Sequence, residues 1–272
     1  MVGAPATADA VQRARRLPDL GVGLHIVLVR GRPVLPPSQI PDLVGPDGDF
    51  RTDLASAGFA FFFRPAVAAQ LEAEIRAQFA AFQATGLALD HVNCHNHMQL
   101  HPTVLGAILR IGRDYGMAAL RLPYEPFLPS WRAGGDGFAG RLGYAAGLRP
   151  WIGLTKARLA RAGIACNDYL FGMYDSGRMT AERVRALIGF LPEGTSEIHL
   201  HPAAGPWRSA DPAAAGYGFA DEFAALLDPG VHDALAGAEV EPIAFRDIGA
   251  ARKPVAGELP HGVSAPHVGR GA

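Results

Sequence analysis

LDHVNCHNHMQLHPT, residues 89–103, places four of the chain's ten histidines within eleven residues. The segment begins as an apolar strand over residues 89–97 and passes through a loop to Pro102, which starts an amphipathic helix. Alternate side chains of a strand face the same way, so four polar residues are predicted to share one face: His91, Asn93, His95 and His97. Neutral imidazoles two residues apart can bind one ion such as zinc. The segment therefore predicts a metal-binding strand end, with a histidine-rich surface turn as the alternative.

Strands and helices alternate on both sides of this segment. Residues 22–29, VGLHIVLV, read as a buried strand, and residues 65–85 as a long helix that ends at Gly86. Further strands are predicted at residues 118–122, 168–172, 197–201 and 240–244, and further helices at residues 7–16, 102–115, 151–162, 180–190 and 219–227. No internal repeat accompanies the alternation. It predicts an α/β fold with a parallel sheet, either doubly wound or closed into a barrel, with its chemistry at the carboxyl ends of the strands.

Composition narrows the classes of function. The chain has 272 residues, with 25 Lys and Arg against 26 Asp and Glu, so its net charge gives no case for binding nucleic acid. Its two cysteines, Cys94 and Cys166, form no disulfide framework and suit a reducing compartment. No apolar stretch is long enough to cross a bilayer, and the start lacks the pattern of a signal peptide. A cytoplasmic protein is expected, and peripheral contact with a membrane is left open.

Three more positions could carry chemistry. His25 lies inside an apolar strand, where it is either a hydrogen-bonded core residue or a ligand. His199 and His201 share one face of the strand in TSEIHLHPAAGPW, residues 195–207, and could give a proton to a leaving group or simply end the strand. Arg121 could orient a carboxylate or a substrate oxygen, or form a surface ion pair.

Two apolar or glycine-rich stretches have a structural and a functional interpretation. FAFFF, residues 59–63, is expected to be core or the start of a helix, and alternatively a wall for a lipid-like substrate. Residues 126–150 form a glycine-rich insertion around Trp131, read as a loop or a lid. Residues 1–249 are expected to form the domain and residues 250–272 a disordered tail. P-loop, dinucleotide-binding, GxSxG and HExxH motifs are absent from the sequence.

Taken together, VGLHIVLV, LDHVNCHNHMQLHPT, RLPYEP and TSEIHLHPA resemble the YdjC/ChbG family of carbohydrate deacetylases, and within it the hopanoid biosynthesis-associated (HpnK) branch. The resemblance extends from Met1 to about Ile248. It implies a (β/α) barrel of the polysaccharide-deacetylase type and removal of an acetyl group from an N-acetylated sugar. It also implies a divalent metal ion, Mg or Zn, held by one aspartate and two histidines.

The resemblance assigns roles to individual residues. It makes His25 the first metal histidine and His95 the second, with His97 next best. It makes His201 the group that protonates the leaving amine, and Arg121, with Asn93, a substrate-binding position. For the hopanoid branch the implied substrate is N-acetylglucosaminyl bacteriohopanetetrol, an N-acetylated glycolipid. Such a substrate implies peripheral contact with the inner membrane, and a homodimer is a further expected partner.

The sequence departs from the family pattern at its start. Family members open with a strand carrying a TADDFG-like segment, whose aspartates supply a metal ligand and the catalytic base. Met1 stands near the family's second strand, and no Asp-Asp pair follows. The barrel is therefore expected to lack its first strand. This polypeptide is expected to have little activity, and a form extended at its N-terminus to be active. A non-catalytic barrel that binds a sugar lipid and a metal-dependent hydrolase of another acetylated sugar are the alternatives.

Overall fold

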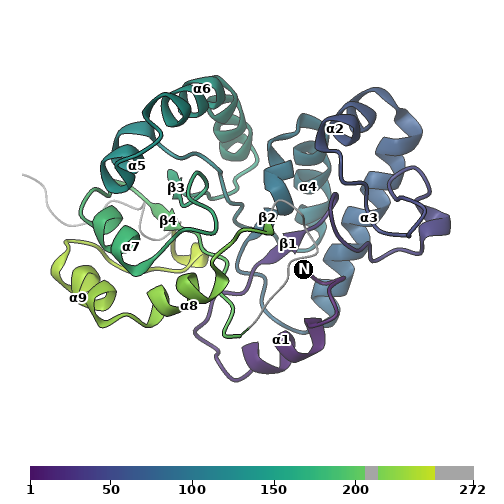
Figure 1. Cartoon of the computed structure of the whole chain (residues 1–272). Helices are drawn as coiled ribbons and strands as arrows, with labels where there is room; N and C mark the ends of the chain where they lie inside the picture. The colour runs from purple at the N-terminus through teal and green to yellow at the C-terminus, as the bar shows by residue number, and fades with distance from the viewer. Residues whose placement is uncertain (206–213, 249–272) are drawn as a thin grey trace, which may run out of the picture.

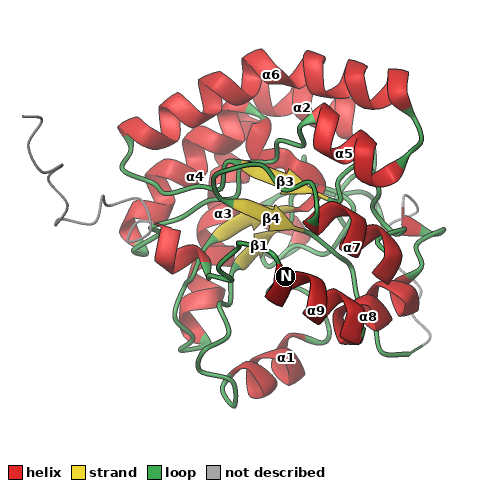
Figure 2. Ribbon diagram, turned by 90° about the vertical axis from the view of Figure 1, so that its left-hand side faces the viewer, coloured by secondary structure: helices red, strands yellow, loops and turns green. Residues whose placement is uncertain are grey.

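The computed structural model describes residues 1–205 and 214–248. It shows a mixed α/β fold in which short parallel strands lie in the interior and helices surround them (Figures 1 and 2). The strands are β1 (Leu24–Ile26), β2 (Val92–Cys94), β3 (Tyr169–Phe171) and β4 (Ser196–Ile198). β1 pairs with β2 and β3 pairs with β4, both in parallel. The predicted parallel α/β architecture is confirmed.

Single bridges continue the parallel arrangement between these two pairs. Val92 bridges Leu120, and Ala119 bridges Ala165, both in parallel. The Leu170 amide then donates to the Tyr124 carbonyl at 2.8 Å. The parallel segments thus neighbour one another in chain order, which brings their carboxyl ends to one side. Closure into a barrel and the absence of a first strand stay predictions.

The strands are shorter than the sequence predicts. Only three residues of the apolar run 22–29 pair as a strand, although Val27, Leu28 and Val29 remain buried. Residues 118–122 form isolated bridges in place of a strand. The strand predicted at residues 240–244 is wrong, because the described chain has no strand there and a 3-10 turn, η4 (Phe245–Asp247), follows. An apolar run indicates that its side chains are buried, and here these side chains are buried although most of the run forms no ladder of strand hydrogen bonds.

Helices fill most of the remaining described chain. They are α1 (Thr7–Ala14), α2 (Leu54–Phe63), α3 (Pro65–Ala84), α4 (Pro102–Asp114), α5 (Phe127–Gly134), α6 (Phe138–Arg161), α7 (Ala181–Ile188), α8 (Phe219–Leu227) and α9 (Pro229–Gly237). Two 3-10 helices, η1 (Pro37–Gln39) and η2 (His95–Leu100), lie between them.

α3 and α7 follow the sequence prediction closely. α3 starts at Pro65 and ends before Gly86, whose φ is +71°. The apolar residues that it buries recur at helical spacing: Val67, Leu71, Ile75, Phe79 and Phe82. α7 has Thr180 as its N-cap, and the Thr180 side chain accepts from the Arg183 amide. Both helices could be predicted because the helical spacing of their apolar residues and the residues at their ends indicate the same boundaries.

α2 corrects the interpretation of FAFFF as core. Asp53 caps this helix by accepting from the amides of Ala55 and Ser56. Phe61 is buried, but Phe59, Phe62 and Phe63 are 64%, 58% and 61% exposed. A helix bordering the core on one side can bury only one stripe of side chains, so consecutive phenylalanines cannot all be core.

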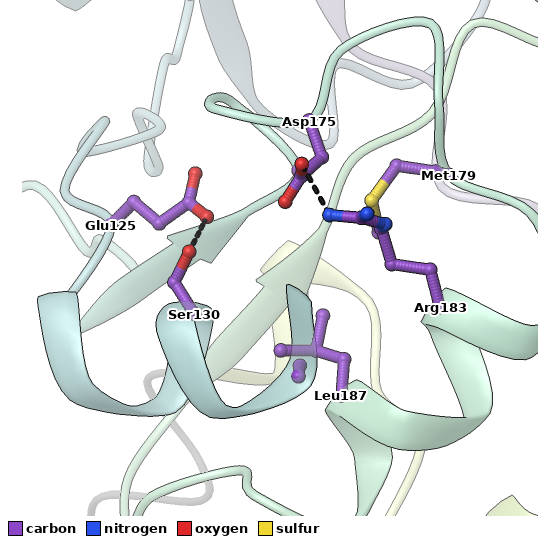
Figure 3. A pocket seen from close by; sticks show the side chains of 8 residues that line it. Glu125, Ser130, Asp175, Met179, Arg183 and Leu187 are labelled. Atoms are coloured by element: carbon purple, nitrogen blue, oxygen red, sulfur yellow. Dashed lines mark hydrogen bonds and ion pairs between the residues drawn. The ribbon is translucent and has the colours of Figure 1, made fainter. Parts of the chain in front are cut away.

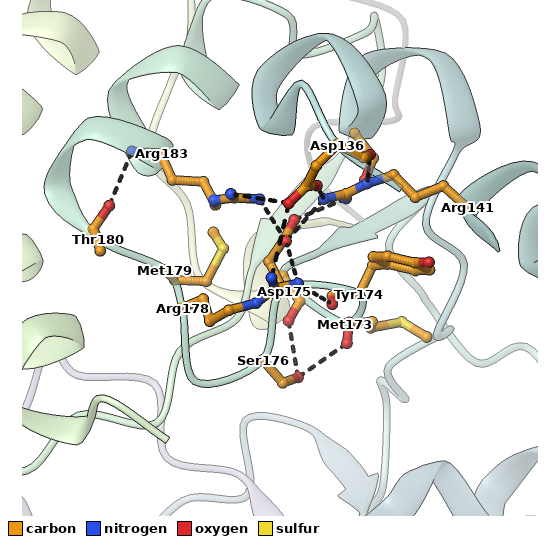
Figure 4. A network of polar contacts seen from close by, with 12 residues as sticks. Asp136, Arg141, Met173, Tyr174, Asp175, Ser176, Arg178, Met179, Thr180 and Arg183 are labelled. Atoms are coloured by element: carbon orange, nitrogen blue, oxygen red, sulfur yellow. Dashed lines mark hydrogen bonds and ion pairs between the residues drawn. The ribbon is translucent and has the colours of Figure 1, made fainter. Parts of the chain in front are cut away.

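The glycine-rich insertion is helical and not a loop. Residues 126–150 contribute all of α5 and the first half of α6, and Gly135, with φ +72°, separates the two helices. The Arg141 guanidinium of α6, 1% exposed, donates to both oxygens of Asp175 at 2.8 Å (Figure 4). Asp175 follows β3, so this buried ion pair ties the insertion to the loop behind that strand.

Two hydrophobic clusters form the described core. The larger contains residues of β1, β2, α2, α3 and α4, and the smaller joins β3 with α7, α8 and α9. The helices that contribute to both clusters surround the parallel strands (Figure 2). The tail predicted for residues 250–272 lies outside the described residues, and the domain boundary stays a prediction.

Candidate functional site

Histidines from three segments approach one another at the carboxyl ends of the strands. The rings of His25 and His95 lie 5.7 Å apart between centroids, and those of His97 and His199 lie 6.1 Å apart. The rings of His199 and His201 are 4.5 Å apart. Electrostatic interactions of His199 with His25 and of His97 with His95 join these pairs into one group, which we call the histidine row.

The predicted pairing of His95 with His97 on one strand face is wrong. β2 ends at Cys94, and η2 begins at His95. Asn96 and His97 adopt left-handed backbone conformations, with φ of 50° and 54°. Because strand alternation stops at Cys94, the His97 ring faces His199 while the His95 ring faces His25. The two histidines occupy different parts of the row.

Arg121 forms an ion pair with Glu197, but this pair is largely buried and does not lie on the surface as one of the two sequence interpretations expected. Its Nε donates to the two Glu197 oxygens at 3.0 and 2.9 Å, and its Nη2 also donates to Glu197. The two side chains are only 11% and 18% exposed. Glu197 was not predicted, although strand alternation in TSEIHLH places it on the face of His199 and His201. Arg121 is thus occupied by a protein carboxylate beside the histidine row.

Burial keeps most of the histidine row neutral. It lowers the pKa of His25 and of His199 well below the ordinary value, and the charge of Arg121 lowers both further. The pKa of His97 is lowered to about 4 mainly by burial. Nδ1 atoms of His97 and His199 are buried and make no hydrogen bond with any described residue. Neutral imidazoles without internal partners can accept a proton or contact a bound ligand.

His201 differs from the rest of the row in its exposure and its partner. Its side chain is 38% exposed, and its Nδ1 lies 3.9 Å from Oε2 of the fully buried Glu222 on α8. The His201 amide donates to the same carboxylate. Burial lowers the pKa of His201, and the charge of Glu222 opposes that shift. Sequence reasoning missed Glu222, because nothing in an amphipathic helix marks which acidic residue turns inward.

The described residues do not complete a metal site. No group of three or more His, Cys, Asp or Glu side chains in residues 1–205 and 214–248 is arranged to hold an ion. His25 and His95 offer two imidazoles, but the predicted third ligand, His97, faces His199. A divalent ion bound by two imidazoles alone lacks the four ligands that structural or catalytic zinc usually has. The metal roles of these three histidines stay predictions.

The cavity in Figure 3 is not the predicted site. It is lined by Glu125, Ser130, Asp175, Met179, Arg183 and Leu187, and its volume is about 10 Å³. Such a volume holds about one water molecule, whereas ligand pockets usually measure ~300–1,000 Å³. The Glu125 carboxylate accepts from the Ser130 hydroxyl at 2.5 Å and from two backbone amides, and burial raises its pKa. These satisfied contacts make the cavity a packing feature between α5, α7 and the loop after β3.

Comparison with known proteins identifies the family. A carbohydrate deacetylase of Geobacillus stearothermophilus is 28% identical over 253 residues, 91% of this chain and 84% of that protein. One from Thermoanaerobacter pseudethanolicus is 27% identical over 204 residues, which cover 75% of this chain and 68% of the relative. A human carbohydrate deacetylase is 30% identical over 220 residues, which cover 74% of this chain and 64% of the human protein.

A solved structure supports the fold alone. It is the crystal structure of an Enterococcus faecalis protein named for cellobiose-phosphate cleavage, 20% identical, with a TM-score of 0.65. The alignment covers 91% of this chain and 85% of that one.

The sequence model of the family of YdjC-like proteins matches residues 1–237. The chain therefore belongs to the YdjC-like protein family.

Proposed function

We propose that this protein hydrolyses the acetamido group of an N-acetylated sugar, releasing acetate and the free amino sugar. The observation that carries the proposal is the convergence of the histidine row and Arg121 beyond the strand ends. Membership of a family whose curated relatives are named carbohydrate deacetylases supports it. Parallel α/β folds place their chemistry at this edge of the sheet.

His201 is the residue suited to move the proton. Amide hydrolysis needs a base that takes a proton from water and an acid that gives a proton to the leaving nitrogen. We assign the second role to His201: a pKa below the ordinary value leaves its ring largely neutral at pH 7, so the ring takes up a proton during the reaction before it donates one to the leaving nitrogen. Buried Glu222 behind Nδ1 stabilises the ring while it is charged. Arg121 and Asn93, on the strands beside the row, are proposed to bind the sugar or its acetyl oxygen.

A divalent ion, Mg or Zn, is part of the proposal but not of the described geometry. Such an ion polarises the amide carbonyl and activates water when it is bound. His25 and His95 are the proposed ligands, with His97 next. A carboxylate ligand is lacking among the described residues, so this proposal requires one from elsewhere.

Acetate release tests the proposed activity. We expect the protein, assayed with Zn²⁺ or Mg²⁺, to release acetate from N-acetylglucosaminyl bacteriohopanetetrol. We expect His201→Asn to lower kcat by roughly 10²–10⁴-fold, the usual contribution of general acid–base catalysis. His232→Asn changes an exposed histidine on α9 and should leave kcat unchanged. An unchanged kcat in the His201 variant would contradict the assigned role.

A second arm of the assay addresses the carboxylate. The same substrate is given to this chain and to a version extended at its N-terminus by an Asp-Asp-containing segment of the family type. We expect the extended version to release acetate faster and to bind the ion more tightly. Equal rates and equal affinities would overturn the proposal that a further carboxylate completes the site.

The glycolipid substrate implies contact with a membrane surface, and α2 is the proposed contact. Three phenylalanines are exposed on this helix: Phe59, Phe62 and Phe63. The Phe62 ring lies 6.3 Å from that of His101, directly after the η2 segment that carries His95. Trp131 stacks on Phe127 inside the insertion and is a weaker candidate. Within the described residues no single helix has the length and apolarity to span a bilayer, and α2 with α3 passes only as a pair bent by 106°.

Vesicle flotation tests the contact. We expect replacement of Phe59, Phe62 and Phe63 by serine to reduce co-flotation with lipid vesicles by roughly tenfold or more, because each buried aromatic contributes about 1.5–3 kcal/mol. The matched control is Leu226→Ser with Leu227→Ser, which removes exposed apolar residues from α8. Equal flotation of both variants would count against α2. A size change in the phenylalanine variant without a flotation change would point to a homodimer through this helix.

The non-catalytic alternative rests on the incomplete metal site. A degenerate barrel that binds a sugar lipid needs no bound ion, and the described residues form no complete ligand set. Tight binding of the glycolipid with no stoichiometric metal and no acetate release would favour it. Metal-dependent acetate release from a different acetylated sugar would favour the other alternative, a hydrolase with another specificity.

A further inference from the structure

The Asn93 side chain lies among three groups that compete for its amide. It is 6% exposed on β2 and stands opposite His25 in the parallel register. One end of the amide lies 2.5 Å from His25 Nδ1. The other end lies 3.3 and 3.2 Å from Arg121 Nη1 and Nη2, and 3.3 Å from His91 Nε2. The amide has two orientations here, and they are chemically different.

With the amide oxygen toward His25, the Nδ1–H of His25 donates to Asn93. The amide nitrogen can then donate to His91 Nε2, since Nδ1 of His91 is engaged by Asp90 at 2.9 Å. However, the same nitrogen faces the two Arg121 amino groups, so donors oppose donors. This orientation gains one long neutral hydrogen bond and leaves a charged guanidinium against an N–H.

With the amide nitrogen toward His25, the donors of Arg121 meet the amide oxygen, and only the 3.3 Å hydrogen bond to His91 Nε2 is lost. The nitrogen donates to His25 Nδ1, and the oxygen accepts from both Arg121 Nη atoms. Hydrogen bonds from a guanidinium are roughly twice as strong as neutral ones. Arg121 cannot easily turn away, because Glu197 holds its Nε and Nη2 in a largely buried pair. The fixed ion pair therefore selects the second orientation.

We propose that Asn93 is a positioning residue that fixes the tautomer of His25, with the proton on Nε2, and that Arg121 and Glu197 enforce this choice. The amide nitrogen of Asn93 lies 2.5 Å from Nδ1 of His25 and can only donate, so Nδ1 carries no proton and the ring proton occupies the other nitrogen. Nδ1 accepts from Asn93, so Nε2 carries the proton.

The tautomer has a consequence that rests on the proposed function. An imidazole binds a metal ion through a nitrogen that carries no proton. His25 in this tautomer offers an N–H donor from Nε2, so binding an ion there requires the Asn93 amide to turn over. When the Asn93 amide turns over, it loses the two hydrogen bonds that Arg121 donates to it. It then accepts one hydrogen bond from His25 and donates one to His91. The network thus opposes metal binding at His25 as long as both Nη atoms of Arg121 donate to Asn93.

Nitrogen NMR of the metal-free protein tests the tautomer directly. With ¹⁵N-labelled histidine at pH 7.5, we expect Nδ1 of His25 to show the shift of an unprotonated nitrogen and Nε2 that of a protonated one. His25→Gln assigns the signals. His232 is the internal reference, because its Nε2 lies 3.0 Å from the Leu226 carbonyl and must donate. A proton on Nδ1 of His25 in the wild-type protein would overturn the proposal.

Asn93→Asp is the decisive variant. Its carboxylate is nearly the same size, accepts from Arg121 on one side, and can only accept from His25 on the other. We expect Nδ1 of His25 to become protonated in this variant and the signals of His232 to stay unchanged. An Nδ1 that remains unprotonated in the folded variant would also overturn the proposal.

Zinc titration separates this inference from the proposed function. Changes in the outer partners of metal-binding histidines typically alter affinity 10–100-fold. We expect Asn93→Asp to bind Zn²⁺ at least about tenfold more tightly than the wild type. Protonation of Nδ1 without tighter Zn²⁺ binding would support the tautomer proposal and contradict the role of His25 as a ligand.

Discussion

His97 should make the stability of the protein depend on pH. Its pKa is about 4 in the folded state, lowered mainly by burial, whereas the pKa of an unfolded histidine is about 6.5. Between these values the unfolded state binds more protons, so the free energy of unfolding rises with pH. The stabilisation is complete above about pH 6.5 and is lost as pH falls toward 4. Each such proton contributes about 1.4 kcal/mol per pH unit.

Urea unfolding of the metal-free protein between pH 4.5 and 7 measures this slope. His97→Asn removes the titrating ring but tolerates the left-handed backbone at this position, where φ is 54°. We expect its slope to fall by roughly one proton. His232→Asn, on the surface of α9, should keep the wild-type slope. Identical slopes in the two variants would show that His97 titrates normally.

The sequence identified histidines that come together in the structure but not the residues that contact them. His25, His95, His97 and His201 stand out because histidine is rare in apolar strands and strand ends. Glu197 and Glu222 do not stand out, since acidic residues are ordinary on strands and helices. Their function in the structure depends on burial beside Arg121 and His201, which no local pattern encodes. The predicted alternation also failed at Cys94, because left-handed Asn96 and His97 end the strand there.

At the level of elements, sequence patterns worked where local signals agree. α3 combines helical spacing, Pro65 at its start and Gly86 beyond its end, and it was predicted within one residue. α2 was harder, because an apolar run of phenylalanines does not show which side faces the core. The first half of α6 contains Gly140, Gly143 and Gly147, with Pro150 following, so its propensity is poor. Tertiary contacts stabilise it instead.

The ion pair between Arg141 and Asp175 should be the main contact that holds the insertion. Arg141 is 1% exposed and Asp175 is 6% exposed, and Asp175 also accepts from Arg178 and Arg183 (Figure 4). Asp175→Asn removes the only buried carboxylate among the described residues that pairs with Arg141 and leaves the half-exposed Asp136. Removing one partner of a buried ion pair costs about 3–5 kcal/mol, so we expect a comparable fall in the free energy of unfolding.

Asp136→Asn is the matched control for the Asp175 variant. Asp136 also accepts from Arg141, at 2.7 Å, but its side chain is 49% exposed. Exposed ion pairs contribute about 0–1 kcal/mol, so this variant should unfold at nearly the wild-type urea concentration. Comparable decreases in the free energy of unfolding of both variants would mean that the ion pair with Asp175 contributes no more to stability than the exposed pair with Asp136.

Across the whole molecule, the chain order of the parallel strands explains why distant segments meet. His25 and Asn93 lie in paired strands, and Arg121 and His201 lie beside or after neighbouring strand segments whose carboxyl ends are on the same side. The alternation of strands and helices predicted this gathering. It could not predict that the ordered strands would be only three residues long, because loops with buried apolar side chains satisfy the same pattern as longer strands.

Asn167 joins the two hydrophobic clusters. It is fully buried, and its Oδ1 accepts from the Leu122 amide at 2.7 Å. Its Nδ2 donates to the Leu122 carbonyl at 3.0 Å and to the Tyr169 carbonyl at 2.8 Å. Leu122 belongs to the larger cluster, whereas Tyr169 packs against the smaller one. One amide therefore supplies three hydrogen bonds across the junction, where water cannot replace them.

Asn167→Ala should weaken this junction and uncouple the two clusters. Each buried backbone group left without a partner costs about 1–3 kcal/mol, so we expect a loss of roughly 3 kcal/mol or more. Hydrogen exchange followed by mass spectrometry reports the two sides separately, through amides of α4 for the larger cluster and of α7 for the smaller one. We expect α7 to open at a lower free energy than α4 in the variant, because the smaller cluster buries less apolar surface. Equal loss of protection in α4 and α7 would contradict this expectation, since the two clusters would then be coupled by contacts other than those of Asn167.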